Sequence, residues 1–371
     1  MQKKFAFVVG DAGGAAMLVP VGQLLMKLGH GLEFLVDADG IAQQVLGKYE
    51  LPKSIYTSGG FDLALSRAED ADVVVINTCA TALNLGKAIY EGLDQGRLRP
   101  KIVFSADGLF NHGYKWLEDQ PDYWLAINDA HARAIISLRL GLLPEKVLVV
   151  GQPAFDSSLE LIPRKEKVRE VTRLKLGIGV QDKAFLWYSQ GMPEVIEEDV
   201  DMVLVAIQEL ADVAVTPVFM AKIHPKLDKL RAGYVAEIVS AIFAKCDAYG
   251  VRCLIAPAGS SDELNLASDV ILSITATDDI RNWIMGGPPV IHMMGPKVCR
   301  WFENDLHLKG SGYLPDVISK EALSIKRNEF WYVTLRKALR LSEREYLRRN
   351  WVAPTEKATN KMVNVLLTLA G

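Results

Sequence analysis

The segment KKFAFVVGDAGGAAMLVP, residues 3–20, passes from an apolar run through a glycine-rich turn into a helical pattern. The apolar run at 5–9 predicts a buried strand, and the apolar spacing over 15–28 predicts the helix that follows it. Short β-rich runs and longer helical patterns alternate in the same way along most of the chain. This alternation is typical of parallel strands joined by crossover helices, so the sequence predicts an α/β fold.

A polar interruption divides this alternation into two parts. At 371 residues the chain exceeds what one hydrophobic core usually organises, so its length favours two domains. The turn GQP at 151–153 ends one strand, and the charged stretch 154–171 after it marks the boundary. We therefore expect Rossmann-like domains at 1–155 and 170–330, with their parallel sheets facing a central cleft. The C-terminal helices, 331–371, lack strands of their own and are expected to pack back on the first domain.

The strand ends matter most, because ligands of open parallel sheets bind beyond the carboxyl ends of the strands. In the first domain the expected strands are 5–9, 32–36, 73–77, 102–105, 123–127 and 147–150. In the second domain they are 185–189, 216–223, 251–255, 270–273 and 290–292. From residue 321 onward we expect helix, apart from an ambiguous run at 330–333. Polar residues that directly follow a strand are therefore the candidates for a ligand site.

The amino-acid composition limits the kinds of binding partner and the cellular compartment that we expect for this chain. The chain has 42 Lys and Arg against 45 Asp and Glu, a net charge of -3, which gives no long-range attraction for nucleic acid. The four cysteines show no disulfide or metal pattern, and no run is apolar enough to span a bilayer, so we expect a cytoplasmic protein. The basic stretch 336–349 fits an exposed helix face, or else contact with an anionic membrane surface or an acidic partner. The oligomeric state, including a homo-oligomer, stays open.

Several strand-end segments resemble those of GT-B glycosyltransferases and the related UDP-N-acetylglucosamine 2-epimerases. VVGQPAFD at 149–156 and RLKLGI at 173–178 are similar to the family's hinge and to the start of its second domain. KIHPK at 222–226 resembles the strand-end His-Pro of bacterial capsule and teichoic-acid transferases. ASDVILS at 267–273, continued by GPPVI at 287–291, resembles a further family segment. The resemblance implies that the second domain holds a UDP- or CDP-linked sugar donor and the first domain an acceptor.

The chain departs from the family pattern at two places. Asn282 stands where many members carry the glutamate that binds the donor ribose. The loop at 10–14 lacks the Gly-His dipeptide of several branches. The Asp-x-Asp at 37–39 lies in the N-terminal half, and no phosphate-binding Gly-Lys-Ser/Thr loop occurs. We therefore expect no catalytic metal and no cofactor.

Two strand ends of the first domain carry candidate catalytic groups. In the first loop, Gly13 and Gly14 let a ligand or a neighbouring backbone approach the start of a helix, although turn chemistry alone explains the same letters. Asp11 is a candidate base or hydrogen-bonding group in the acceptor site. Asp107 and His112 are the leading acid–base candidates, because a carboxylate can deprotonate a hydroxyl and imidazole titrates near neutral pH. An Asp-Gly turn and a surface histidine are the alternatives.

The first two strand ends of the second domain carry candidate phosphate contacts. Ser189 and Gly191 lie where the family places a small loop against the donor phosphates, and an ordinary turn is the alternative. His224 precedes a proline, which holds it extended at the strand end. Together with Lys226 it would offset the charge of a diphosphate without a metal. A structural role is the alternative for this histidine.

A later strand end of the second domain combines hydroxyls with acids. Thr275 and Thr277 can cap the next helix, whose N–H groups make a phosphate site. Asp278, Asp279 and Asn282 follow on its first turn, within reach of ribose hydroxyls. A favourable interaction of the acidic pair with the helix dipole is the structural alternative.

Three functions fit these residues. The first is metal-independent transfer of a sugar from a nucleotide-sugar to an acceptor, as in polysaccharide biosynthesis. The second is 2-epimerisation or hydrolysis of a nucleotide-sugar. The third is a GT-B-like protein that binds a ligand or partner without turnover, which the departure at Asn282 keeps open.

Overall fold

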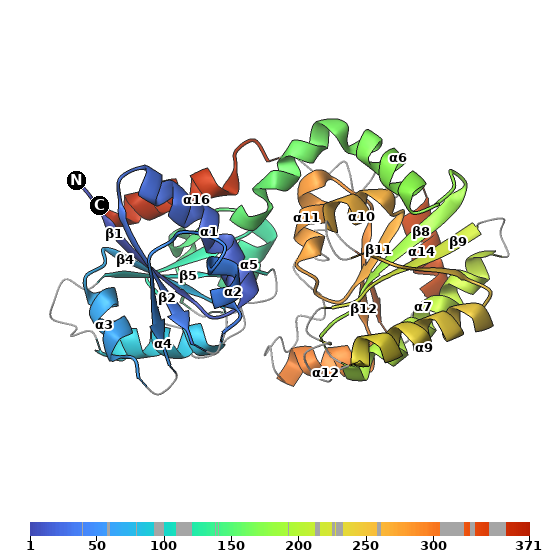
Figure 1. The fold of residues 1–371 in the computed structure, drawn as a ribbon, viewed down its shortest axis with the longest axis horizontal. Coiled ribbons are helices and arrows are strands. Elements are labelled where there is room, and N and C mark those ends of the chain that lie inside the picture. Colours follow the sequence, from blue (N-terminus) through green and yellow to red (C-terminus); the bar gives the residue numbers. More distant parts are fainter. Residues whose placement is uncertain are drawn as a thin grey trace. The chain divides into compact units, whose positions relative to one another are not determined.

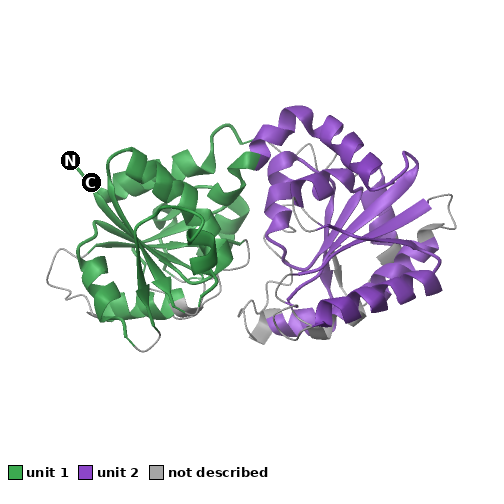
Figure 2. Cartoon of the chain, viewed as in Figure 1, with its two compact units in different colours: residues 1–157, 354–371 green, residues 158–353 purple. Residues whose placement is uncertain are grey.

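The computed structural model describes the chain in two compact units (Figure 2). Unit 1 comprises Met1–Ser157 and Pro354–Gly371, and unit 2 comprises Ser158–Ala353. The residues not described are 39, 58–59, 79, 93–99, 109–120, 138, 140, 192, 212–215, 225–226, 228–232, 258–260, 305–322, 327–330 and 341–353. Each unit has its own parallel sheet with helices on both faces (Figure 1), which confirms the predicted α/β class with two Rossmann-like domains.

The described part of unit 1 contains a seven-stranded sheet in the order β3-β2-β1-β4-β5-β6-β7. Its strands are β1 Lys4–Val9, β2 Gly31–Asp37, β3 Lys53–Tyr56, β4 Val73–Asn77, β5 Lys101–Ser105, β6 Tyr123–Ala126 and β7 Val147–Val149. In the central strand β1, Phe5 pairs with Leu32 of β2 and with Val73 of β4. After β3 the chain crosses to the other side of β1, so the strand order reverses between β1 and β4. Such reversals are the usual ligand sites of open α/β sheets.

Helices cover both faces of this sheet (Figure 1). One face carries α1 Ala12–Lys27, α2 Ala42–Leu46 and α16 Ala358–Ala370, and the other carries α3 Asp62–Glu69, α4 Ala80–Gly92 and α5 Asp129–Ser137. The short helix η2, Pro144–Lys146, precedes β7. Met362 and Leu366 of α16 are buried in the same core as Leu18 of α1. The last helix therefore completes the core of the first unit.

The described part of unit 2 contains a six-stranded sheet in the order β10-β9-β8-β11-β12-β13. Its strands are β8 Asp182–Tyr188, β9 Thr216–Lys222, β10 Arg252–Ile255, β11 Val270–Ser273, β12 Val290–Met294 and β13 Leu323–Lys326. Its helices, beginning at the junction of the units, are η3 Pro153–Arg164, α6 Lys165–Lys175, α7 Pro193–Ala211, α9 Tyr234–Ala248, α10 Ser261–Ala267, α11 Asp278–Met285, α12 Pro296–Asn304 and α14 Trp331–Leu339. α10 and α11 cover one face, and α7 and α9 cover the other (Figure 1). The strand order reverses between β8 and β11.

The first residue of the segment RLKLGI, Arg173, forms a buried ion pair near the start of unit 2. Arg173 in α6 donates to Asp269 Oδ2 at 3.1 Å, and both side chains are less than 10% exposed. The same guanidinium donates to the carbonyl oxygens of Gly179 and Asp182 at 2.7 and 2.8 Å. Asp269 in turn accepts from the backbone N–H of Ala184 in β8 at 2.9 Å. This pair therefore ties α6 to the amino ends of the central strands β8 and β11.

Two edge strands and the C-terminal segment differ from expectation. β13, Leu323–Lys326, lies in a stretch that we expected to be helical, and that expectation is wrong, because Leu323 pairs with Ile291 of β12. β3 was not predicted either. Edge strands of four residues with one pairing partner carry too few apolar residues to give a clear alternating pattern. The expected C-terminal segment 331–371 is divided, since α14 contacts α7 in unit 2 and α16 contacts α1 in unit 1.

Candidate functional site

Asp11 caps the amino end of α1 in unit 1. Its Oδ1 accepts a hydrogen bond from the backbone N–H of Gly14 at 2.8 Å. A carboxylate at this position satisfies one helix-end N–H and interacts favourably with the helix dipole. Capping thus accounts for Asp11 structurally, and its role toward an acceptor remains a proposal.

Gly13 and Gly14 allow two polar side chains to approach α1 closely. A Cβ on Gly13 would lie 2.2 Å from Asp107 Oδ2, and a Cβ on Gly14 would lie 2.2 Å from Asn77 Oδ1. Both separations are far inside van der Waals contact, so these positions accommodate glycine alone without a shift of the neighbouring side chain. The glycine loop therefore packs on side chains from the ends of β4 and β5, beside the strand reversal of unit 1.

Asp107 is held by contacts on its side chain and on its backbone. It is 8% exposed, and its Oδ1 accepts a hydrogen bond from the hydroxyl of Thr78. Its backbone oxygen accepts from Gln152 Nε2 at 2.6 Å. Neither Thr78 nor Gln152 was among the predicted site residues. Both lie just beyond the ends of strands, β4 and β7, which is the signal that would have found them.

The segment 149–156, which follows β7 in the chain, contacts the amino end of the last helix, α16. Gly151 has a φ of +92°, a backbone conformation that favours glycine, and a Cβ on it would lie 2.7 Å from Ala358 Cβ. Asp156 accepts from the backbone N–H groups of Ala358 and Thr359 at 2.7 and 2.9 Å. Asp156 therefore caps α16 from a distant part of the chain.

The structure brings Ser189 and His224 together at the carboxyl ends of β8 and β9. The hydroxyl of Ser189 accepts from the backbone N–H of His224 at 2.7 Å, and the backbone N–H of Ser189 donates to the Lys222 oxygen at 3.0 Å. Ser189 is buried, whereas His224 and Gly191 are partly exposed. The serine thus fixes the backbone of the histidine at the strand end. Two predicted residues, His112 and Lys226, lie outside the described residues.

Lys222, a further cationic residue, ends β9. Its Nζ donates to the hydroxyl of Ser261 in α10 and lies 5.6 Å from the centre of the Tyr188 ring. Burial lowers the pKa of Lys222 below its ordinary value, while the carboxylate of Asp278 acts in the opposite direction. Burial and the charges of Asp278 and Asp279 raise the pKa of Tyr188. Lys222 was not among the predicted site residues, although it belongs to the KIHPK segment.

Ser273 organises the turn between β11 and α11. Its hydroxyl accepts from the backbone N–H of Ala276 at 3.0 Å and donates to Asp279 Oδ2 at 2.7 Å. Thr277 occupies the N-cap position but makes no side-chain cap hydrogen bond, so the expected capping by this threonine is wrong. Because the nearby serine forms the turn, the threonine side chain is left at the surface. Thr275 is partly exposed and Thr277 is exposed.

The three predicted ribose contacts lie in different environments. Asp279 is 4% exposed and accepts the serine hydrogen bond just described. Asn282 is 3% exposed, and its Nδ2 donates to the Pro288 oxygen at 2.8 Å, which stabilises the turn before β12. Asp278 is more exposed, with its Oδ1 3.2 Å from Arg281 Nε. Of the three, Asp278 is the side chain most accessible to a ligand.

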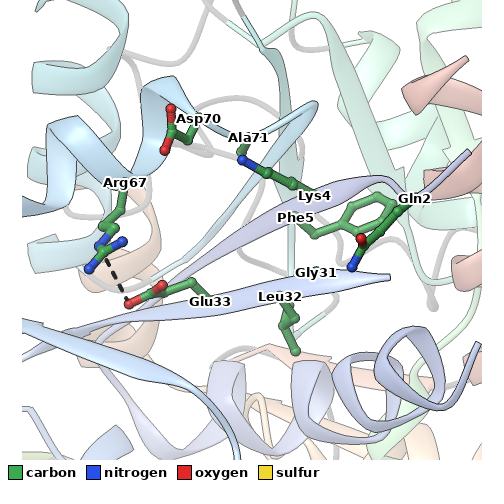
Figure 3. A pocket seen from close by; sticks show the side chains of 9 residues that line it. All are labelled: Gln2, Lys4, Phe5, Gly31, Leu32, Glu33, Arg67, Asp70 and Ala71. Atoms are coloured by element: carbon green, nitrogen blue, oxygen red, sulfur yellow. Dashed lines mark ion pairs between the residues drawn. The ribbon is translucent and has the colours of Figure 1, made fainter. Parts of the chain in front are cut away.

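A separate hollow of about 270 Å³ lies at the opposite end of the unit 1 sheet (Figure 3). Lys4 and Gly31, the first residues of β1 and β2, contribute to its wall. On one side Arg67 Nε lies 4.0 Å from Glu33 Oε1. Ligands of parallel sheets bind at the carboxyl ends of the strands, so we do not assign the candidate site to this hollow.

In the described ranges, no group of three or more His, Cys, Asp and Glu side chains is arranged to hold a metal ion. Within the same ranges, no helix has both the length and the apolarity needed to cross a membrane.

Solved structures of GT-B enzymes match the chain over nearly its full length. MurG of Acinetobacter baumannii superposes with a TM-score of 0.65 and 12% identity, over 99% of both chains. The UDP-GlcNAc 2-epimerase of Neisseria meningitidis bound to UDP-GlcNAc has a TM-score of 0.63 and 15% identity, over 99% of this chain and 100% of that one. HepE of Anabaena in complex with UDP and glucose has a TM-score of 0.57 and 14% identity, over 100% of this chain and 97% of that one.

Comparison with protein-family models and with curated protein sequences gives no match. The identities to the solved structures are low, so they establish the architecture of the chain and leave its reaction to be argued from residues. The likeness confirms the resemblance that the strand-end segments indicated. This chain has the fold of the GT-B glycosyltransferases and UDP-N-acetylglucosamine 2-epimerases.

Proposed function

We propose that the protein is a metal-independent GT-B glycosyltransferase that transfers a sugar from a UDP- or CDP-linked donor to an acceptor hydroxyl. The main observation behind the proposal is the strand-order reversal between β8 and β11, which is bordered by Ser189 on one side and by Thr275 and Thr277 on the other. Parallel sheets bind nucleotides at such reversals, with phosphates near helix N-termini. The UDP in the HepE complex supports a nucleotide-sugar donor.

The charges at the two strand reversals favour unit 2 as the donor-binding unit. In unit 1, the carboxylates of Asp11 and Asp107 lie close to the start of α1 and would repel a diphosphate. In unit 2, the end of β9 carries Lys222 and His224, and the carboxylates of Asp262 and Asp278 are paired with Arg281. The proposed phosphate contacts are Ser189, Gly191, His224, Lys226, Thr275 and Thr277.

In the proposed reaction, Asp107 accepts the proton of the acceptor hydroxyl. The acceptor oxygen then attacks the anomeric carbon, the bond from that carbon to the phosphate oxygen breaks, and the nucleoside diphosphate leaves with the electron pair. His224 and Lys226 stabilise the negative charge of the leaving group. His112 is the alternative base, and Asp11 is assigned to hydrogen bonding of the acceptor.

For the donor ribose we propose Asp278. The side chain of Asn282, at the position of the family glutamate, already donates to Pro288 and holds a turn. Asp279 is engaged by Ser273. The more exposed carboxylate of Asp278, on the first turn of α11, is therefore the best placed of the three to accept hydrogen bonds from ribose hydroxyls.

Two other functions have specific support. The likeness to the Neisseria epimerase favours 2-epimerisation or hydrolysis as the second candidate. The inward-facing Asn282 favours binding without turnover as the third. Incubation with UDP- and CDP-sugars, with and without candidate acceptors, followed by chromatography of nucleotides and sugars, separates them. Release of nucleotide that requires an acceptor supports transfer, and turnover without an acceptor supports the second candidate. Binding without turnover supports the third, and the absence of both contradicts all three.

A further inference from the structure

Two cysteines of unit 2 come together where α9 is followed by β10. Cys246 lies in the last turn of α9, and Cys253 is the second residue of β10. The turn between them is tight, because the backbone N–H of Val251 donates to the Cys246 oxygen at 2.9 Å and Gly250 has a φ of +64°, which favours glycine. This helix-end motif leads the chain directly from α9 into β10, so the two cysteines lie on elements that pack together.

Both side chains lie between α9 and the sheet. The buried residues of α9 recur every four positions, and Cys246 is the last of them. In β10, Leu254 packs in the same core as Leu264 of α10, on the face of the sheet opposite to α9 (Figure 1). Successive residues of a strand point to opposite faces, so Cys253 points to the face that α9 covers.

The two thiols are hydrogen-bonded to each other, and neither forms a disulfide in the structure. Cys246 is 0% exposed, whereas Cys253 is partly exposed. The hydrogen bond from Cys246 lowers the pKa of Cys253, while burial and the charge of Asp247 act in the opposite direction. Cys253 is therefore the thiol of the pair that a reagent in solution reaches, and Cys246 stands ready beside it.

We propose that Cys246 and Cys253 form a thiol–disulfide modification site, which a low-molecular-weight disulfide such as glutathione disulfide oxidises to an intramolecular disulfide. The Cys253 thiolate attacks one sulfur of the small disulfide, which forms a mixed disulfide and releases one small thiol. The Cys246 sulfur, after losing its proton, attacks the Cys253 sulfur and displaces the second small thiol. Two protein thiols are oxidised and one small disulfide is reduced to two thiols, so atoms and electrons balance.

The modification fastens an edge strand. β10 pairs with β9 alone in the described part of unit 2, and each of its residues is partly or fully exposed. A covalent link to α9 closes a short loop across the turn and restricts local opening of the strand. Cys253 lies near the amino end of β10, whereas ligands of parallel sheets bind beyond the carboxyl ends. The inference is therefore independent of the proposed function.

The experiment treats the folded full chain with glutathione disulfide, denatures it, blocks the remaining thiols with N-ethylmaleimide and counts them by mass spectrometry. Trypsin cuts after Arg252, so the two cysteines fall in separate peptides that only a disulfide joins. Cys246→Ser and Cys253→Ser each remove one thiol of the pair. Cys299→Ser is the matched control, because Cys299 is a partly exposed cysteine of the same unit that donates to the Met294 oxygen at 3.5 Å.

We expect wild type and Cys299→Ser to lose two thiols and to yield peptides 246–252 and 253–281 joined by a bond that dithiothreitol breaks. Cys246→Ser should stop at a mixed disulfide of Cys253 with glutathione, and Cys253→Ser should leave the buried Cys246 unmodified. Alkylation of both cysteines in wild type would overturn the inference, as would a mixed disulfide that persists on Cys253 beside a free Cys246. If a serine variant fails to fold, the peptide map of wild type decides alone.

Discussion

Replacement of Asp156 by alanine tests how the end of the chain is fastened to unit 1. The change removes the acceptor of the Ala358 and Thr359 N–H groups at the start of α16. Loss of an N-cap side chain costs about 0.5–2 kcal/mol, and loss of a charge at a helix N-terminus costs about 0.3–1 kcal/mol more. We therefore expect Asp156→Ala to destabilise the docked α16 by about 1–3 kcal/mol.

Complete undocking of α16 would cost more free energy than the loss of the Asp156 cap does. Its side chains Met362, Val363 and Leu366 are at most 1% exposed. At about 1.5–3 kcal/mol for each buried side chain, undocking exposes roughly 4.5–9 kcal/mol of apolar burial. Apolar packing therefore outweighs the cap, and the helix should stay docked in the variant but open more often.

Hydrogen exchange followed by mass spectrometry measures this opening. Peptides from α16 should exchange about 5- to 140-fold faster in Asp156→Ala, which corresponds to the expected loss at about 1.4 kcal/mol per tenfold change. Asp156→Asn is the control, because asparagine is also a good N-cap and loses only the charge. Unchanged exchange in α16 would show that the two hydrogen bonds do not hold the helix. Full exchange of α16 with unit 1 still folded would refute the dominance of packing.

Three further variants test individual contacts. Gly14→Ala should lower the free energy of unfolding by about 1–3 kcal/mol in urea, because the new methyl group overlaps Asn77, and unchanged stability would mean that the crevice has room. Arg173→Met removes one of the two arginines that pair with Asp269, because Arg169 Nη2 also lies 2.8 Å from Asp269 Oδ1, and it should cost about 1–3 kcal/mol in the same assay; unchanged stability would contradict a structural role. Ser189→Ala removes the acceptor of a backbone N–H at the strand end, so the UDP dissociation constant should rise while the far-UV circular dichroism spectrum stays the same; an unaltered constant would separate this serine from the site.

The fold was predictable because buried central strands carry strong local signals. β1 and β4 are apolar at nearly every position, as strands covered on both faces must be, and both were identified from sequence. β3 and β13 were missed because they are four-residue edge strands with one neighbour each. Their pairing depends on tertiary structure, and a local sequence pattern carries no information about tertiary structure.

The sequence allowed us to predict that the candidate site residues lie at strand ends, but not which side chains contact one another there. The sequence singled out Gly13 and Asp107 separately, and the structure shows that the missing Cβ of one makes room for the carboxylate of the other. Asn282 was expected at the ribose, whereas its side chain donates to Pro288. Such differences arise because a side chain's partner lies on another element, and spacing along one element carries no information about it. The contact between Lys222 and Ser261 was not predictable for the same reason, since Ser261 comes from α10.

The most direct test of the proposed donor site is calorimetric titration of UDP and CDP into wild type and His224→Ala, beside a thermal melt of both proteins. If His224 contacts the donor diphosphate, the variant should bind the nucleotide about 1.5–3 kcal/mol more weakly, the range for a hydrogen bond to a charged group. Its melting temperature should change little, because the bond to Ser189 uses the backbone N–H and survives the substitution. An unchanged dissociation constant, or a lower melting temperature with unaltered affinity, would contradict nucleotide binding at this strand end.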